Sequence, residues 1–156
     1  MKIKSQEISE NFLSSNLKSI YFIYGPNSGL VNNIYKKIID VFEIEENNPF
    51  STTKISSEDL LNRKINLLDE INTISAFCEY KNILIDIRNT REYSNIKSIL
   101  NEAIETKISK IRIIIIAGQL KSSDKLIQFY NKCEDSFCIG CYDEEKFLNE
   151  KKLQEY

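Results

Sequence analysis

The chain has 156 residues, with 21 Lys and Arg against 23 Asp and Glu, and it contains no histidine. This length suits one domain with a real core, and 42% hydrophobic and 28% charged residues are usual for a globular domain. The lack of histidine excludes Ser-His-Asp and Cys-His catalytic pairs and His-based zinc sites. A net charge of −2 disfavours a domain whose whole surface binds nucleic acid.

Neither a membrane span nor a secretion signal is visible in the sequence. The longest apolar run, Ile113 to Ala117, is far shorter than the roughly 20 residues that cross a bilayer. The first residues, Met1 to Gln6, turn polar at once and lack the apolar core of a signal peptide. We therefore expect a cytoplasmic protein without a membrane partner, with its cysteines reduced.

The first half of the chain begins its regular structure with a buried strand over residues 19–24, which ends at Gly25 and Pro26. A helix follows, capped by Asn27 or Ser28, and its apolar face comprises Leu30, Ile34, Ile38 and Phe42. Residues 50–55 are expected to form a short edge strand. The spacing then predicts one helix over residues 57–71, with an apolar face of Leu61, Ile65, Leu68 and Ile71.

The second half alternates in the same way, with strands predicted over residues 82–87, 110–117 and 137–142 and helices over residues 93–103 and 122–131. Strands that are apolar on both faces and separated by helices indicate a parallel sheet covered on both sides. We therefore expect an α/β three-layer sandwich with a parallel five-stranded sheet over residues 1–142. Residues 143–156 are expected to begin a further, charged helical region.

The turn after the first predicted strand is the natural place for a ligand, because a helix N-terminus presents free N–H groups. Its residues are Gly25, Pro26, Asn27, Ser28 and Gly29. A nucleotide-binding P-loop needs a lysine and then Ser or Thr after its second glycine, but Leu30 and Val31 stand there. The pattern favours a structural turn that holds no nucleotide, and a divergent P-loop ATPase remains the alternative.

Asp86 ends the next buried strand, as the Mg²⁺-binding acid of an ATPase does, but Ile87 stands where a second acid would follow. Basic residues gather where the strands end, notably Arg88, Arg91 and Lys121. A solvated rim is the simpler interpretation of these residues. If they converge, the alternative is a sequence-independent contact to a DNA backbone.

Cys138 and Cys141 have the CxxC spacing, with Cys133 five residues before. A zinc site without histidine would need Cys78 as well, and alternation along a strand directs Cys138 and Cys141 to opposite faces. We therefore expect buried, inert thiols and no bound metal or other cofactor.

An apolar stretch, Ile74 to Phe77, lies between the helix predicted over residues 57–71 and the next strand. Two interpretations stay open for it. Its apolar side chains could plug the core, or Phe77 could stand out as an exposed hydrophobic wedge of the kind that anchors protein partners.

Taken in order, four parts of the chain together resemble the N-terminal, AAA+-type domain of the delta subunit of the bacterial DNA polymerase III clamp loader. Those parts are Tyr21 to Val31, Ile74 to Phe77 followed by Lys81 to Ile85, Ile113 to Leu126, and Cys141 to Asp143. The resemblance implies an AAA+ core that has lost nucleotide binding and has no catalytic activity of its own. It also implies a role in DNA replication, in which delta grips the ring-shaped sliding clamp, the beta subunit, and opens one interface.

In that family a short hydrophobic element inserts into the clamp, and by position it falls on Ile74, Ala76 and Phe77 here. Ala76 departs from the larger aliphatic residue that is usual at its place, so the resemblance implies a weaker grip or a greater reliance on Phe77. Delta subunits continue into a lid and a collar domain that assembles the loader. Contacts with the other loader subunits are therefore expected through regions that this chain does not contain, and contact with primed DNA is expected only within the full complex.

Overall fold

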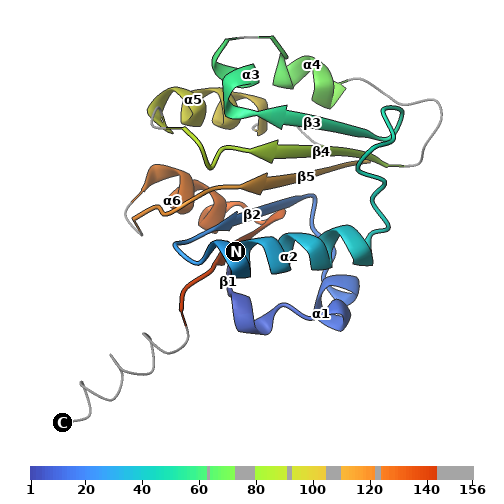
Figure 1. Ribbon diagram of the computed structural model, residues 1–156, viewed down its shortest axis with the longest axis vertical. Helices are drawn as coiled ribbons and strands as arrows, with labels where there is room; N and C mark the ends of the chain where they lie inside the picture. The colour runs from blue at the N-terminus through green and yellow to red at the C-terminus, as the bar shows by residue number, and fades with distance from the viewer. Residues whose placement is uncertain (63, 73–79, 91–92, 105–109, 122–123, 144–156) are drawn as a thin grey trace.

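The computed structural model describes residues 1–62, 64–72, 80–90, 93–104, 110–121 and 124–143. Their strands are β1 (Lys2–Lys4), β2 (Ile20–Tyr24), β3 (Thr52–Ser56), β4 (Lys81–Asp86), β5 (Ile111–Ile116) and β6 (Ser136–Gly140). Their helices are the 3-10 turn η1 (Ser5–Glu7), α1 (Glu10–Ser15), α2 (Ser28–Val41), α3 (Ser57–Leu61), α4 (Leu67–Asn72), α5 (Tyr93–Ile104) and α6 (Lys125–Lys132). Figure 1 shows helices on both faces of one sheet.

The described strands form a six-stranded sheet in the order β1-β6-β2-β5-β4-β3, and every neighbouring pair is parallel. The predicted parallel sheet is confirmed, and β3 is an edge strand as expected. The predicted number of five strands is wrong. Strand β1 was missed because Lys2–Lys4 carries a single apolar residue, Ile3, and is too short to give a clear pattern. It pairs with β6, which is therefore an inner strand.

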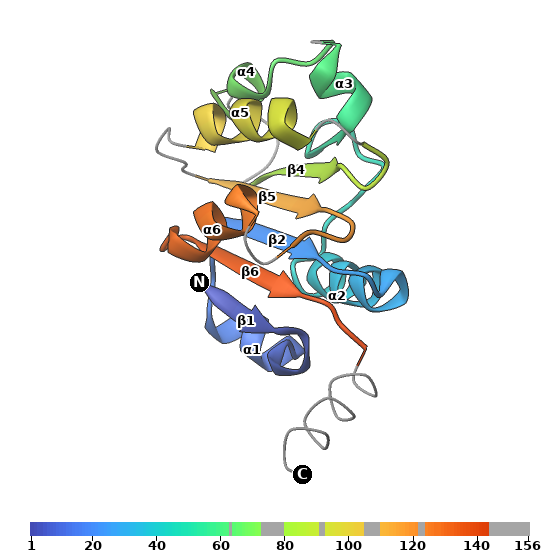
Figure 2. The same ribbon diagram turned by 90° about the vertical axis from the view of Figure 1, so that its left-hand side faces the viewer.

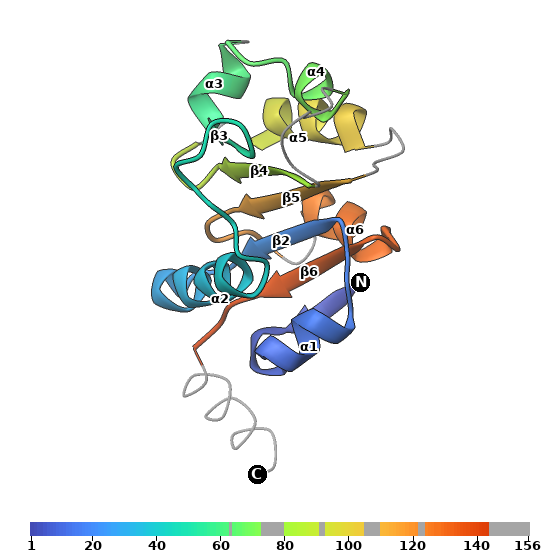
Figure 3. The ribbon, with the colours of Figure 1, turned by 90° about the vertical axis from the view of Figure 1, so that its right-hand side faces the viewer.

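Successive residues of β2 point to opposite faces of the sheet, and each face has its own apolar core. Phe22 and Tyr24 pack with buried residues of α3, α4, α5 and α6, whereas Tyr21 and Ile23 pack with those of α1 and α2. Figures 2 and 3 show these two helical layers from opposite sides. The predicted three-layer α/β sandwich is thus confirmed, since a parallel sheet of this kind is stable when both of its faces are covered.

The helix predicted over residues 57–71 is in fact two short helices, α3 and α4. Asn66 separates them, because its side-chain oxygen accepts hydrogen bonds from the amides of Leu68 and Asp69 at 3.0 and 3.3 Å and caps a new helix. The break shifts the helical register, so that Leu67 is buried and Leu68 is only partly buried. The predicted apolar face was therefore wrong at Leu68.

Helix α2 begins where the sequence predicted, because the Asn27 side chain accepts a hydrogen bond from the Leu30 amide at 3.0 Å. Helix α6 begins at Lys125, since Asp124 caps it through the Leu126 amide. Within the described part of the chain, no helix has both the length and the apolar character needed to cross a bilayer.

Candidate functional site

The turn between β2 and α2 is packed directly against the end of β6. Gly25 has φ = +137°, and a Cβ atom at this position would lie 2.1 Å from the carbonyl oxygen of Cys141. The Gly25 amide donates to the carbonyl of Gly118, just after β5, at 3.0 Å. Only glycine fits here, because the backbone both adopts a conformation that L residues rarely reach and touches a neighbouring strand end.

Most of the amides that a phosphate would need in this turn already have partners. The Asn27 amide donates to the Cys141 carbonyl at 3.3 Å, and the Leu30 and Val31 amides donate to Asn27. Pro26 has no N–H group at all. A phosphate cradle depends on several free amides that point at the ligand. Here the Gly25 and Asn27 amides hold the turn to the ends of β5 and β6, and the Leu30 and Val31 amides form the start of α2.

The side chains after the turn are no better suited to a phosphate. Val31 is buried in the core under α2, and Leu30 packs partly buried against the same cluster. The nearest lysines of α2 are Lys36 and Lys37, and the ammonium group of Lys37 donates to the carbonyl of Ile8 at 3.4 Å. The position of the P-loop lysine is therefore occupied by an apolar residue that helps to fix the helix.

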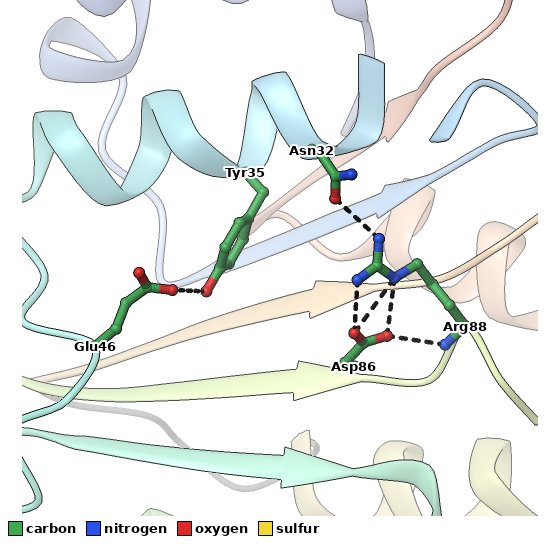
Figure 4. Close-up of polar contacts among 5 residues, drawn as sticks. All are labelled: Asn32, Tyr35, Glu46, Asp86 and Arg88. Carbon is green, nitrogen blue, oxygen red and sulfur yellow. Dashed lines mark hydrogen bonds and ion pairs between the residues drawn. The ribbon is translucent and has the colours of Figure 1, made fainter. Parts of the chain in front are cut away.

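The acid at the end of β4 is held by a guanidinium group. Arg88 Nη2 lies 2.8 Å from Asp86 Oδ2, and Arg88 Nε lies 3.1 Å from Oδ1. Arg88 Nη1 donates to the side-chain oxygen of Asn32 on α2 at 2.9 Å (Figure 4). Arg88 thus connects the end of β4 to the first half of α2.

These contacts change the titration of Asp86. Its partial burial by itself raises the pKa of the carboxyl, but the hydrogen bonds from the Arg88 side chain and amide outweigh burial, so the pKa lies below its ordinary value. The carboxylate is therefore ionised at neutral pH and already has a cation beside it. This arrangement leaves Asp86 poorly placed to serve as a metal ligand.

A second polar contact lies farther along α2. The Tyr35 hydroxyl donates to the Glu46 carboxylate, and burial together with this bond raises the pKa of Tyr35 (Figure 4). Between α2 and the ends of β3 and β4 there is an open cavity of about 380 Å³, with Tyr35, Lys54, Asp86 and Arg88 in its lining. Three of these four lining side chains already have partners within the chain, because Asp86 and Arg88 pair with each other and Tyr35 donates to Glu46.

The other residues proposed from the sequence are distributed as follows. Lys121 is exposed after β5, and Gly29 and Ser28 are exposed in the first turn of α2. Ile74, Ala76, Phe77 and Arg91 lie outside the described residues, as do residues 144–156. The structure therefore gives the surroundings of the β2–α2 turn and of Arg88 and is silent on the apolar stretch.

The cysteines of the CxxC pair lie in separate core layers, Cys138 with α6 and Cys141 with α2, as strand alternation predicted. Burial raises the pKa of both thiols to about 12. In the described ranges, no three Cys, Asp or Glu side chains gather in a way that could hold a metal ion. Cys78 lies outside those ranges.

Sequence reasoning missed Asn32 and Tyr35, which the structure places opposite the end of β4. Both occupy partly or fully exposed positions of α2 and look like ordinary solvent-facing residues in the helical pattern. Only the Asp86-Ile87-Arg88 spacing, with opposite charges two residues apart, hinted at a local ion pair. No sequence signal connected it to Asn32.

Sequence comparisons do not place the chain: no family model matches it, and no curated protein is similar enough to match. Comparison of structures does find a likeness. The Bacillus subtilis DNA clamp loader delta protein (YqeN) matches with a TM-score of 0.61 at 15% sequence identity, over 82% of this chain and 39% of that chain. The chain thus has the fold of part of the clamp loader delta protein and spans about two-fifths of its length.

Proposed function

We propose that this chain is the clamp-binding domain of a clamp loader delta subunit, a protein-interaction module of DNA replication. The observation that carries the proposal is the structural likeness to the Bacillus subtilis clamp loader delta protein over 82% of the chain. The order of the sequence segments that resemble the same family also supports it.

The second element of the proposal is that the domain works without nucleotide and lacks a functional Walker A loop. The hydrogen bonds and the ion pair around the β2–α2 turn support this element. The amides of Gly25, Asn27, Leu30 and Val31 are engaged within the chain, and Arg88 neutralises Asp86. A nucleotide with Mg²⁺ that used these groups would have to compete with the contacts they already make.

The third element is the mechanism of clamp opening. We assign clamp contact to Ile74, Ala76 and Phe77, whose apolar surface would be removed from water in a pocket of the clamp. Such binding opens a ring only if it is tighter to the open form than to the closed form, since a ligand shifts an equilibrium by its differential affinity. No chemical step on this chain is required.

The remaining partners belong to the complete assembly. We assign contacts with other clamp loader subunits to regions beyond this chain, and contact with primed DNA to the full cytoplasmic complex. Of the basic residues proposed for the DNA backbone, Arg88 is already paired with Asp86, so its contribution would be smaller than that of the exposed Lys121.

Calorimetric titration tests the proposal directly. The chain is titrated with the cognate sliding clamp, once in buffer and once with ATP and Mg²⁺, and separately with ATP and Mg²⁺ alone. We expect clamp binding of the same affinity in both buffers and no heat from nucleotide. Micromolar ATP binding together with no binding of the clamp would instead support the divergent P-loop ATPase.

A further inference from the structure

Arg112 lies at the edge of the sheet where β4 and β5 begin. Its guanidinium carbon is 3.8 Å from the centre of the Phe42 ring, at the end of α2, and 5.1 Å from that of the Tyr80 ring, just before β4. Its Nη1 donates to the side-chain oxygen of Asn82, its neighbour on β4, at 3.2 Å. Figure 1 shows α2 ending at the edge where these two strands begin. Two rings and one amide thus position the guanidinium.

This guanidinium has no acidic partner in the part of the chain that the structure describes, since Arg112 takes part in none of the ion pairs found there. Burial lowers the pKa of Arg112, whereas hydrogen bonds to Asp86 raise the pKa of Arg88. Arg112 is therefore a partly buried cation whose loss of water no anion offsets. Asn82 accepts from one of its five N–H donors, and a carboxylate can accept from two of them in parallel.

The surroundings of Arg112 suit a protein partner better than a nucleic acid. The Tyr80 side chain is 45% exposed beside the guanidinium, and tyrosine and arginine are enriched among the residues that dominate protein interfaces. Glu43 and Glu45, both exposed, follow Phe42 in the chain. A surface that binds a phosphate backbone is instead basic throughout.

We propose that Arg112, stacked between Phe42 and Tyr80, receives a carboxylate of the sliding clamp, and that the Tyr80 ring packs against the clamp beside it. The inference rests on the proposed function, which supplies the clamp as the partner. Tyr80 follows Phe77 by three residues, so their Cα atoms are at most about 11 Å apart. A usual interface covers about 800 Å² on each partner, which is wide enough to include both residues.

Calorimetry with the cognate clamp tests this contact with two pairs of variants. Arg112→Gln removes the guanidinium, and Lys36→Gln removes an exposed cation of α2 as its control. Tyr80→Ala removes the exposed ring, and Tyr142→Ala is its control, because the Tyr142 side chain is 44% exposed. Arg112→Lys keeps the positive charge but cannot offer two parallel N–H groups to one carboxylate.

We expect Arg112→Gln to raise the dissociation constant about tenfold and Tyr80→Ala to raise it about fivefold. Arg112→Lys should recover only part of the lost affinity, because it restores the charge without the paired donors. Both control variants should bind the clamp like the unaltered chain.

A second measurement observes the carboxylate contact without the clamp. Acetate is added to the isotope-labelled chain while NMR follows the Nε–Hε signals of the arginine side chains, with chloride at the same ionic strength as the control. We expect the Arg112 signal to shift with acetate, and the signal of Arg88, which already binds Asp86, to stay in place. Arg112→Lys identifies the Arg112 signal by its loss.

Three results would overturn the inference. They are equal clamp affinity of Arg112→Gln and the unaltered chain, an Arg112 signal that acetate does not shift, and a shift with single-stranded DNA at far lower concentration than with acetate. If Arg112→Gln does not fold, Tyr80→Ala and the acetate titration decide.

The proposed function fails separately, when the unaltered chain does not bind the clamp. The clamp is then excluded as the partner, whereas the acetate titration still decides whether Arg112 receives a carboxylate.

Discussion

Arg88 binds the carboxylate of Asp86, two residues earlier in the chain, through two nitrogen atoms. Nη2 lies 2.8 Å from Oδ2, and Nε lies 3.1 Å from Oδ1. The same guanidinium reaches Asn32 on α2. In parallel α/β sheets, ligands commonly bind beyond the carboxyl ends of the strands. At the end of β4 this chain places a contact among its own side chains, Arg88, Asp86 and Asn32.

Replacing the acid of this pair should give a pH-dependent loss of stability. We expect Asp86→Asn to lower the free energy of unfolding by about 1 kcal/mol at neutral pH, because the pair is only partly buried. The pKa of Asp86 is depressed in the folded state, so the contribution is complete above the ordinary aspartate pKa of about 3.9 and is lost as the pH falls through the lower folded value.

Urea denaturation at pH 7 and at pH 3 measures this difference. Asp40→Asn, which alters an exposed aspartate of α2, is the control and should change stability little at either pH. A stability deficit of Asp86→Asn that is the same at both pH values would contradict the assigned role of Arg88.

Two glycines of the β2–α2 turn should respond in opposite ways to alanine. Gly25→Ala brings a Cβ against the Cys141 carbonyl and forces a strained φ, so we expect a loss of about 3 kcal/mol or more. Gly29 is inside α2, where the nearest atom to an added Cβ is Asn27 Oδ1 at 3.5 Å. Gly29→Ala should therefore be neutral or stabilise by up to about 1 kcal/mol.

Thermal and urea unfolding of both glycine variants would show the contrast. Equal stability of Gly25→Ala and Gly29→Ala would mean that the turn is not packed against the end of β6 as described.

Installing the missing lysine should not create a nucleotide site. In Leu30→Lys the charge is supplied at the P-loop position, but the Gly25 and Asn27 amides remain bonded to carbonyls of the neighbouring strand ends. We therefore expect no ATP binding at micromolar concentrations in calorimetry with Mg²⁺. Micromolar affinity in this variant would show that the lysine alone was lacking and that the turn can release its amides.

The buried thiols should resist alkylation until the protein unfolds. Because burial raises the pKa of Cys138 and Cys141 to about 12, the reactive thiolate is scarce at pH 8. Cys133 is only partly buried and should react sooner in the native protein. Mass spectrometry of peptides after timed alkylation, with and without urea, distinguishes the sites. Equal native labelling of Cys133 and Cys138 would refute this expectation.

The strands in the centre of the sheet could be predicted because burial on both faces leaves an unmistakable run of apolar residues. Ile113 to Ile116 in β5 is such a run, and β2 and β4 are similar. Strand β1 could not be predicted in the same way, because what makes Lys2–Lys4 a strand is its pairing with β6, far away in the sequence. The pattern of apolar residues within Lys2–Lys4 does not show which distant strand it pairs with.

The candidate site shows the same division. Residues 25–31 match a P-loop poorly, and this can be seen from those residues alone, so the sequence was enough to indicate it. The role of Arg88 depends on Asn32, 56 residues earlier, and on the crossing of α2 over the sheet. The prediction that Leu68 belongs to the apolar face was wrong because Asn66 caps a new helix there. The spacing of apolar residues alone favoured one continuous helix through Asn66.

The most direct test of the central claim is the affinity of this chain for its cognate sliding clamp, measured by calorimetry beside two phenylalanine variants. We predict that the unaltered chain binds, and that Phe77→Ala weakens binding by about 1–3 kcal/mol, or roughly 5- to 150-fold, while the domain stays folded. Phe50→Ala, which removes a phenylalanine that is 64% exposed, should bind like the unaltered chain. Equal affinity of Phe77→Ala and the unaltered chain, or no binding by either, would contradict the account.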